Sequence, residues 1–434
     1  MQFCSDKDIK IMTGVLAASL LLGGCSAVKP SNSAEPLTND PSIKAEINFR
    51  DVSKTDYDQD LMDKEYRRYC FELFSQSVRD YGTDKNIMIS PASIMMALDM
   101  VAAGSKGDSL DQLTELFAEG QAPLTQQAYA AELMDKINNS RKIEFACANA
   151  VWTNKSILGN KVNTEYVDYI QDTFLSEYTV TDFNDKTPGE INAWIDEHTD
   201  HMIEKAVECL GTDTVMVLVN AIAFDAKWAE KYEDYQVNDD DFHAADGSEQ
   251  KATFLSDVTS AYYEMEKATG FIKEYEGGQY GFLVILPTDE NVSANEFAAD
   301  FTAEDYEKFI NSVSYEYEVH SRMPEFEYDF EYGVNDTLIN LGCTDIFDPK
   351  AADLSGIAGE KGDLYVSMVF HKTHIEVDRS GTKAAAVTVV SVDCASAVSE
   401  ATPIKNVNCD RPYAYAIVDL ETMAPIFVGT VNEV

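Results

Sequence analysis

Histidine and cysteine are two of the side chains that most often bind transition metals or act in catalysis, and both are scarce in this chain. The sequence has 434 residues, of which 6 are His and 8 are Cys. Glu197, His198 and His201 lie close together in a predicted helix, but they lack the His-Glu-x-x-His order of zinc peptidases. An exposed polar helix face explains the same spacing, and we prefer that interpretation. We therefore expect no metal and no cofactor.

The sequence also lacks the motifs of the common enzyme classes. Ser, His and Asp all occur, but no Gly-x-Ser-x-Gly turn presents a nucleophile. No glycine fingerprint for a phosphate or a dinucleotide appears, and the cysteines form no Cys-x-x-Cys pair. These observations argue against an enzyme.

One stretch, His371–Thr402, offers a different chemistry. It begins as an alternating strand at 373–378 and turns at 379–381. Small and β-branched residues then run from Thr382 to Val392 with a single charge, and a polar segment follows. We interpret this stretch as an exposed loop that presents a peptide bond to a protease and can become a strand. An ordinary permanent strand is the alternative.

The side-chain pattern of this stretch permits burial. Alternate residues of a strand point to opposite faces of a sheet. With Thr382 inward, the inward set has no charge and can be buried at little cost: Thr382, Ala384, Ala386, Thr388 and Val390. The outward set places its one charge toward solvent: Lys383, Ala385, Val387, Val389 and Ser391.

The N-terminus predicts export and lipid attachment. An apolar run, Ile11–Leu22, follows Lys7 and Lys10 and is too short to span a bilayer. It ends in Gly23-Gly24-Cys25, which resembles a bacterial lipobox with Cys25 as the lipid anchor. An ordinary signal peptide with a chance cysteine is the alternative. We predict a signal peptide at 1–24, a flexible tether at 25–55 and one domain at 56–434.

The net charge limits the partners. A formal charge of −43 at pH 7 would repel nucleic acid and anionic membranes, and no basic stripe could hold a heparin-like polyanion. We expect contact with a membrane only through the lipid anchor.

Hydrophobic periodicity places the main elements. Helices are expected around 66–78, from Pro91 to Gly104, after Ser109 as a cap, and at 191–202 and 334–341. Strands are expected at 86–89, 143–153, 214–224 (covered on both faces), 271–276, 280–287, 315–328, 413–419 and 425–431. Helices dominate the first half and strands the second, which predicts a single α+β domain.

The order of short motifs resembles the serpin family. The resemblance covers nearly all of residues 60–432 and rests on these segments: Ser90-Pro91-Ala92-Ser93-Ile94, Ala148-Asn149-Ala150-Val151-Trp152, Ile191-Asn192-Ala193-Trp194-Ile195, Leu218-Val219-Asn220-Ala221-Ile222, Met323-Pro324-Glu325-Phe326, His371-Lys372-Thr373-His374-Ile375-Glu376-Val377, Gly381-Thr382, Ala384-Ala385-Ala386, Arg411-Pro412-Tyr413 and Phe427-Val428-Gly429.

The resemblance implies a five-stranded central sheet, two further sheets, about nine helices and an exposed reactive loop. It implies a suicide inhibitor, whose loop is cleaved and then inserts into the central sheet with the protease attached. It assigns the hinge of the loop to Gly381, Thr382, Lys383, Ala384, Ala385 and Ala386. It assigns a polar gate cluster beneath the sheet opening to Ser90, Ser93, Asn220 and His371.

Family spacing places the reactive bond between Ala395 and Ser396. A small residue before the bond suggests an extracellular serine protease of the elastase or subtilisin type, with a cysteine protease as a second candidate. We expect a monomer secreted to the outer face of a bacterial membrane. Cys394 and Cys409 could form a disulfide, but it would hinder insertion, so we predict free thiols.

Three departures from the family pattern keep an alternative open. The family usually has glutamate at the positions of Arg379 and Lys383, and a glycine before the Lys227-Trp228 pair. These differences leave open a non-inhibitory surface protein on the same fold, or a substrate that is cleaved without trapping the protease.

Overall fold

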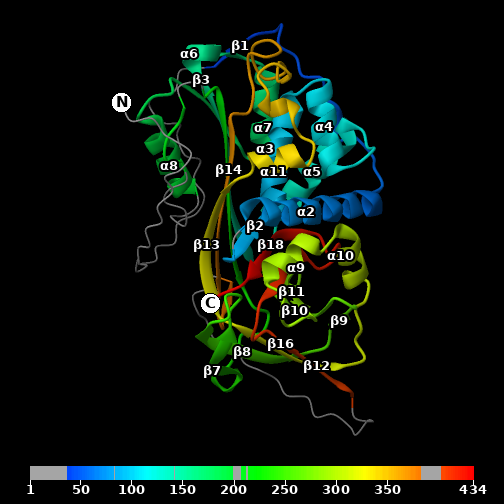
Figure 1. Ribbon diagram of the computed structural model, residues 1–434. Coiled ribbons are helices and arrows are strands. Elements are labelled where there is room, and N and C mark those ends of the chain that lie inside the picture. Colours follow the sequence, from blue (N-terminus) through cyan, green and yellow to red (C-terminus); the bar gives the residue numbers. More distant parts are fainter. Residues whose placement is uncertain (1–36, 83, 141, 199–206, 212–213, 383–401) are drawn as a thin grey trace.

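The computed structural model describes residues 37–434, except 83, 141, 199–206, 212–213 and 383–401 (Figure 1). Its helices are α1 (Phe49–Val52), α2 (Gln59–Tyr81), α3 (Pro91–Gly104), α4 (Asp108–Phe117), α5 (Pro123–Asn138), α6 (Lys155–Leu158), α7 (Thr164–Phe174), α8 (Thr187–His198), α9 (Ala294–Asp300), α10 (Ala303–Ile310) and α11 (Asn335–Asn340). Two short 3₁₀ turns lie at Asp234–Gln236 and Asp345–Phe347.

Three large sheets organise the strands. The central sheet has the order β13 (Phe326–Gly333), β14 (Met368–Val377), β15 (Gly381–Thr382), β6 (Met216–Lys227), β3 (Ile143–Asn154) and β5 (Glu177–Thr181). A second sheet has the order β2 (Ile87–Ile89), β18 (Pro425–Val431), β17 (Tyr413–Asp419), β11 (Tyr280–Pro287), β10 (Ala268–Glu274) and β9 (Tyr262–Glu264). The third has the order β16 (Ile404–Asn408), β12 (Glu318–Pro324), β8 (Glu249–Thr259) and β7 (Val237–His243).

The predicted α+β architecture is confirmed, with one informative difference in the central sheet. Five long strands were expected, and the sixth member is the two-residue strand β15. A small pair, β1 (Thr38–Asn39) with β4 (Lys161–Val162), adds a fourth sheet.

The central sheet separates two hydrophobic cores. In Figure 1 α3 and its neighbouring helices lie on one side of the sheet and α8 lies on the other. Even-numbered residues of β6 such as Leu218 and Ile222 belong to the large core, whereas Val217 and Val219 pack with Ile195 of α8. The prediction that this strand is covered on both faces is therefore confirmed.

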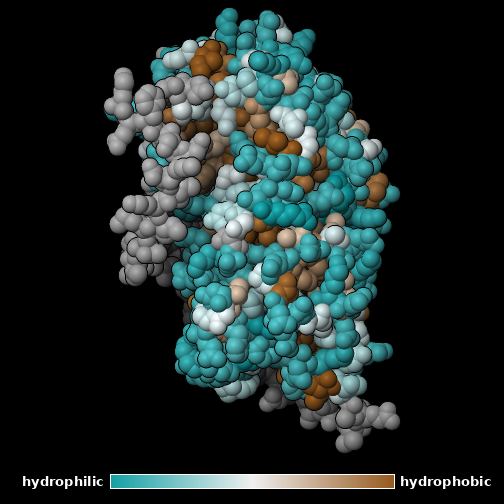
Figure 2. Space-filling model, in the orientation of Figure 1, coloured by the Kyte–Doolittle hydropathy of each residue, from teal (hydrophilic) through white to brown (hydrophobic). Residues whose placement is uncertain are grey.

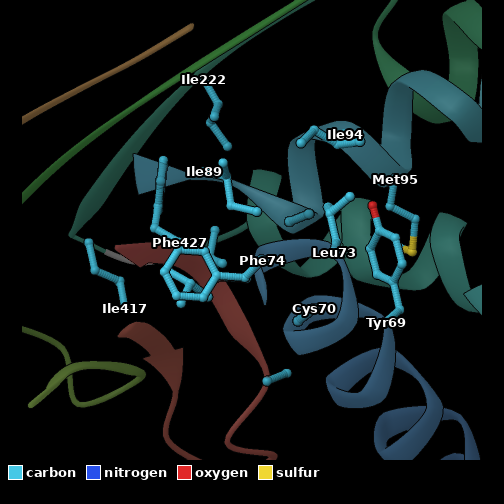
Figure 3. Packing of buried hydrophobic residues seen from close by; sticks show 14 of the residues in the cluster. Tyr69, Cys70, Leu73, Phe74, Ile89, Ile94, Met95, Ile222, Ile417 and Phe427 are labelled. Carbon is cyan, nitrogen blue, oxygen red and sulfur yellow. The ribbon is translucent and has the colours of Figure 1, made fainter. Parts of the chain in front are cut away.

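The large core lies directly under the sheet. Figure 3 shows Ile222 of β6 above Ile89 of β2 and Ile94 of α3, with Phe74 of α2 and Phe427 of β18 beyond them. The helix predicted from the spacing of Tyr66 to Val78 is α2, and those side chains face this core.

Two local predictions were wrong. Gly107 is the N-cap of α4, whereas the Ser109 hydroxyl accepts a hydrogen bond from the amide of Asp353. The strand expected at 315–328 is two strands in different sheets, β12 and β13, with Glu325 between them. Within the segment predicted as a tether, the described residues contact the domain: Phe49 stacks on Tyr169 with ring centroids 4.4 Å apart.

The surface agrees with the acidic composition. The face in Figure 2 is mostly hydrophilic, with apolar residues in small separate groups. Among the described residues, none of the helices has the length and apolar character needed to cross a membrane.

Candidate functional site

The chain that follows β14 turns back and enters the central sheet. Gly381 and Thr382 form β15, which pairs antiparallel with Val377 of β14 on one side and with Ala226 and Lys227 of β6 on the other. Beyond this point β14 and β6 pair directly, in parallel, from Met368↔Val217 to Lys372↔Ala221. The sheet is thus closed at one end and holds the start of an additional strand at the other.

Gly381 lies too close to β6 for a side chain. A Cβ atom at this position would be 2.1 Å from the carbonyl oxygen of Ala226 and 2.7 Å from the Cα of Lys227. Glycine is therefore required by close backbone approach. This close approach lies at the first residue of the hinge that the family resemblance predicts.

A group of aromatic residues fixes the turn before the hinge. The Trp228 indole N–H donates to the carbonyl oxygen of Asp378 at 2.8 Å, and its backbone N–H donates to the carbonyl of Ser380 at 3.0 Å. The Tyr275 ring stacks on Trp228 with centroids 4.6 Å apart, and its hydroxyl lies 2.6 Å from the Thr382 hydroxyl. No local pattern in the sequence indicates that Trp228 and Tyr275 would contact this turn.

The structure brings together the described members of the gate cluster. The backbone N–H of Ser90 donates to His371 Nε2 at 2.9 Å, and the Ser90 hydroxyl donates to the carbonyl of Ile426 at 2.7 Å. The Ser93 N–H donates to the Ser90 hydroxyl at 3.2 Å. Asn220 is the β6 partner of His371 in the strand register, while its side chain lies outside the described part of the structure.

Burial keeps His371 neutral. Its Nε2 accepts a hydrogen bond, so the proton of the neutral ring is on Nδ1, which is buried and has no hydrogen-bond partner among the described residues. Loss of solvation lowers the pKa of His371 to about 3. An unpaired N–H in the core is a cost that an incoming hydroxyl group could remove.

Arg379, one of the basic departures, has partners at the surface. Its guanidinium donates to Asp234 Oδ1 at 2.9 Å, and its backbone N–H donates to Glu325 Oε1 at 3.1 Å. Burial, together with the nearby charges of Asp378 and Glu376, raises the pKa of Glu325 despite the hydrogen bond from Arg379. The surroundings of the turn are therefore acidic, which suits a basic residue.

Several predicted site residues lie outside the described part of the structure. They are Cys25, the hinge residues Lys383, Ala384, Ala385 and Ala386, and the reactive-bond residues Ala395 and Ser396.

Two further predictions concern Cys409 and His198. Cys409 is a free and buried thiol, as predicted. His198 stacks on Trp194 and its Nδ1 lies 2.7 Å from the carbonyl oxygen of that residue, so it is tied to its own helix. His201 lies outside the described residues.

Comparison with known proteins agrees with this geometry. Residues 64–434 match a family model described as Serpin (serine protease inhibitor). The chain is 28% identical to an uncharacterised serpin-like protein of Methanosarcina mazei, over 98% of this chain and 97% of the relative. It is 31% identical to Iripin-5 of Ixodes ricinus, over 80% of this chain and 89% of the relative.

Solved structures give the same result. The native state of the thermophilic serpin tengpin matches with a TM-score of 0.79 and 33% identity, covering 90% of this chain and 100% of tengpin. The latent state of tengpin matches with a TM-score of 0.73 and 32% identity, covering 88% of this chain and 99% of tengpin. The chain therefore belongs to the serpin family.

Proposed function

We propose that this protein traps a serine protease by inserting its cleaved loop between β14 and β6. The observation that carries the proposal is the position of β15, which pairs with both strands at one end of the sheet while the two strands pair with each other at the other end. The strand that would separate them has already begun to form.

The register of the described strands defines the inserted state. Thr382 pairs with Val377 and with Ala226 in antiparallel register. If the strand continued in this register, each further loop residue would pair with residues whose numbers on β14 and on β6 are lower by one. Six positions on, Thr388 would lie between His371 and Asn220, which are themselves partners in the closed sheet. Because the same register holds on both sides, insertion would require separation of β14 from β6 but no sliding of either strand.

The neighbours in this register suit the loop. Ala384 would lie between Ile375 and Phe224, which are both buried, so a small apolar residue is needed there. Thr388 would lie beside His371, and its hydroxyl could accept a hydrogen bond from the Nδ1–H of that residue. Insertion would thus satisfy a buried donor that has no partner among the described residues of the closed sheet.

The chemical step follows from the exposed bait bond. The protease serine would attack the Ala395 carbonyl carbon, form an ester with it and release the amino group of Ser396. Insertion would then carry the ester away from the position where water attacks it. A small residue before the bond favours elastase- or subtilisin-like proteases, and a cysteine protease is the second candidate.

A protease panel tests the proposal. Incubation with an elastase-like protease should give an SDS-stable complex and a released C-terminal fragment that begins at Ser396. Cleavage of the wild-type protein without a complex, and with no gain in heat resistance of the cleaved form, would instead identify a non-inhibitory serpin.

Two adjacent residues provide a matched pair of variants. Ala384→Arg would place a charge between Ile375 and Phe224, so the loop should be cleaved without trapping the protease. Ala385→Arg introduces the same side chain at the next position, which would lie on the outward face beside His374. The protein with this substitution should still form the complex. Equal behaviour of the two variants would overturn the register.

The site of action is proposed from the sequence alone. We infer that Cys25 carries a lipid that holds the protein on the outer face of a bacterial membrane. Wild-type protein should fractionate with membranes and Cys25→Ser should not. A wild-type protein in the soluble fraction would contradict lipid anchoring without affecting the inhibitory mechanism.

A further inference from the structure

The outward face of the β13–β14 pair carries a histidine surrounded by carboxylates. Glu327 pairs directly with Glu376 across the two strands, and Asp329 pairs directly with His374. Residues two apart on a strand share a face, so these four side chains emerge on the same side of the sheet. In Figure 1 β13 and β14 run side by side along the margin of the molecule.

The histidine is oriented in the way that metal ligands usually are. His374 Nδ1 lies 2.9 Å from Asp329 Oδ1, and a carboxylate only accepts hydrogen bonds, so Nδ1 carries the proton. The lone pair of the neutral ring is then on Nε2. A histidine that binds a metal usually donates its other ring N–H to a carboxylate, which fixes the tautomer and the ring.

Three residues of this face bring possible ligand atoms close together. One atom each of Glu327, His374 and Glu376 lie within 4.8 Å of one another. With metal–ligand bonds near 2.0–2.2 Å in a tetrahedron, ligand atoms are about 3.4 Å apart. Glu327 is exposed and can rotate, so a small movement of side chains would close the remaining distance.

We propose that Glu327, His374 and Glu376 form a zinc site on the outward face of β13 and β14, with Asp329 as the residue that positions His374. Three protein ligands leave a fourth tetrahedral position for water. The ion would link β13 to β14, which both lie on the same side of the opening at β15.

The donor set selects the metal. One imidazole and two carboxylates suit zinc and other first-row divalent ions, whereas magnesium and calcium prefer sites made entirely of oxygen. Cobalt should bind more tightly than manganese, because affinities at such sites follow the Irving–Williams order. Magnesium and calcium should not compete at millimolar concentration.

Calorimetric titration of the full chain with zinc chloride tests the site. We expect one equivalent of zinc to bind, and His374→Ala and Glu327→Gln to abolish that binding. Asp329→Asn leaves all three ligands in place but removes the carboxylate that holds His374, so it should weaken zinc binding about 10- to 100-fold. Circular dichroism and thermal unfolding without metal establish that each variant is folded.

His320 provides the matched control, because the net charge of −43 could attract zinc weakly at many places. It is also an exposed strand histidine beside a carboxylate, with Nε2 2.8 Å from Glu318 Oε1. His320→Ala should bind zinc like the wild type. The proposal is overturned if zinc binding is absent in the wild type, persists in His374→Ala, or is lost in His320→Ala but not in His374→Ala.

Discussion

The substitution Lys383→Glu gives the sharpest test of the insertion register. Lys383 directly follows Thr382, so in the inserted strand it would lie between Glu376 on β14 and Asp225 on β6. Glutamate is the residue that the family usually has at this position. Judged by resemblance alone, Lys383→Glu should improve inhibition; judged by the neighbouring charges, it should impair it.

The size of the effect follows from pairs across neighbouring strands. An opposite-charge pair contributes roughly 0.2–1 kcal/mol, and a like-charge pair costs a similar amount. The substitution removes two favourable pairs and creates two unfavourable ones, which gives roughly 0.8–4 kcal/mol in total. At 1.36 kcal/mol per tenfold, the balance between insertion and release of the protease should shift about 4- to 900-fold toward release. The shift should shrink at high salt, because these charges lie on the solvent side of the sheet.

The assay is titration of a fixed amount of protease with inhibitor, followed by gel analysis of complex and cleaved inhibitor. Lys383→Glu should leave more cleaved inhibitor outside the complex, Lys383→Ala should be intermediate, and the double variant with Glu376→Lys should recover part of the loss. The thermal midpoint of the loop-cleaved form gives a second measurement that does not depend on trapping. A Lys383→Glu variant that traps protease as well as the wild type would refute the register and the charge argument.

Three further predictions concern the closed sheet. His371 has a folded pKa near 3, below its usual value, so the unfolded chain takes up a proton first as the pH falls. The contribution of the neutral His371 ring to the free energy of unfolding is complete above about pH 6.5 and is lost between pH 6.5 and pH 3, with a loss of roughly 2 kcal/mol at pH 5. Urea unfolding at pH 7 and pH 5 should show a smaller loss of stability in His371→Gln than in the wild type. Equal losses would contradict a buried neutral ring. Gly381→Ala should lower stability by roughly 1–3 kcal/mol because its Cβ would collide with the β6 backbone, whereas Gly333→Ala, with open space around it, should be nearly neutral; similar thermal midpoints for the two would disprove the close approach. Trp228→Phe removes the 2.8 Å hydrogen bond to Asp378 and should cost about 1 kcal/mol and speed cleavage of the loop; an unchanged cleavage rate would show that this bond does not hold the turn.

The sequence predicted most of the helices and strands that the structure describes. The helix from Tyr66 to Val78 could be recognised because its apolar residues recur at helical spacing over several turns. Ser90 before Pro91 predicted the start of α3, because a capping hydroxyl and a proline at the first position act locally. Local signals failed where the partner was distant: nothing between 315 and 328 shows that β12 and β13 belong to different sheets.

What the sequence determined by itself is therefore local: an acidic chain, alternating strands and a segment with one uncharged face. Only the tertiary structure decided that Gly381 lies against the backbone of β6, that Trp228 holds the turn, and that His371 has a buried nitrogen without a partner among the described residues. It also decided that Asp225 and Glu376, the residues next to the β15 pairing on β6 and β14, come from strands far apart in the chain. Their proximity is a consequence of strand pairing, and pairing between distant segments leaves no periodic signal in either one.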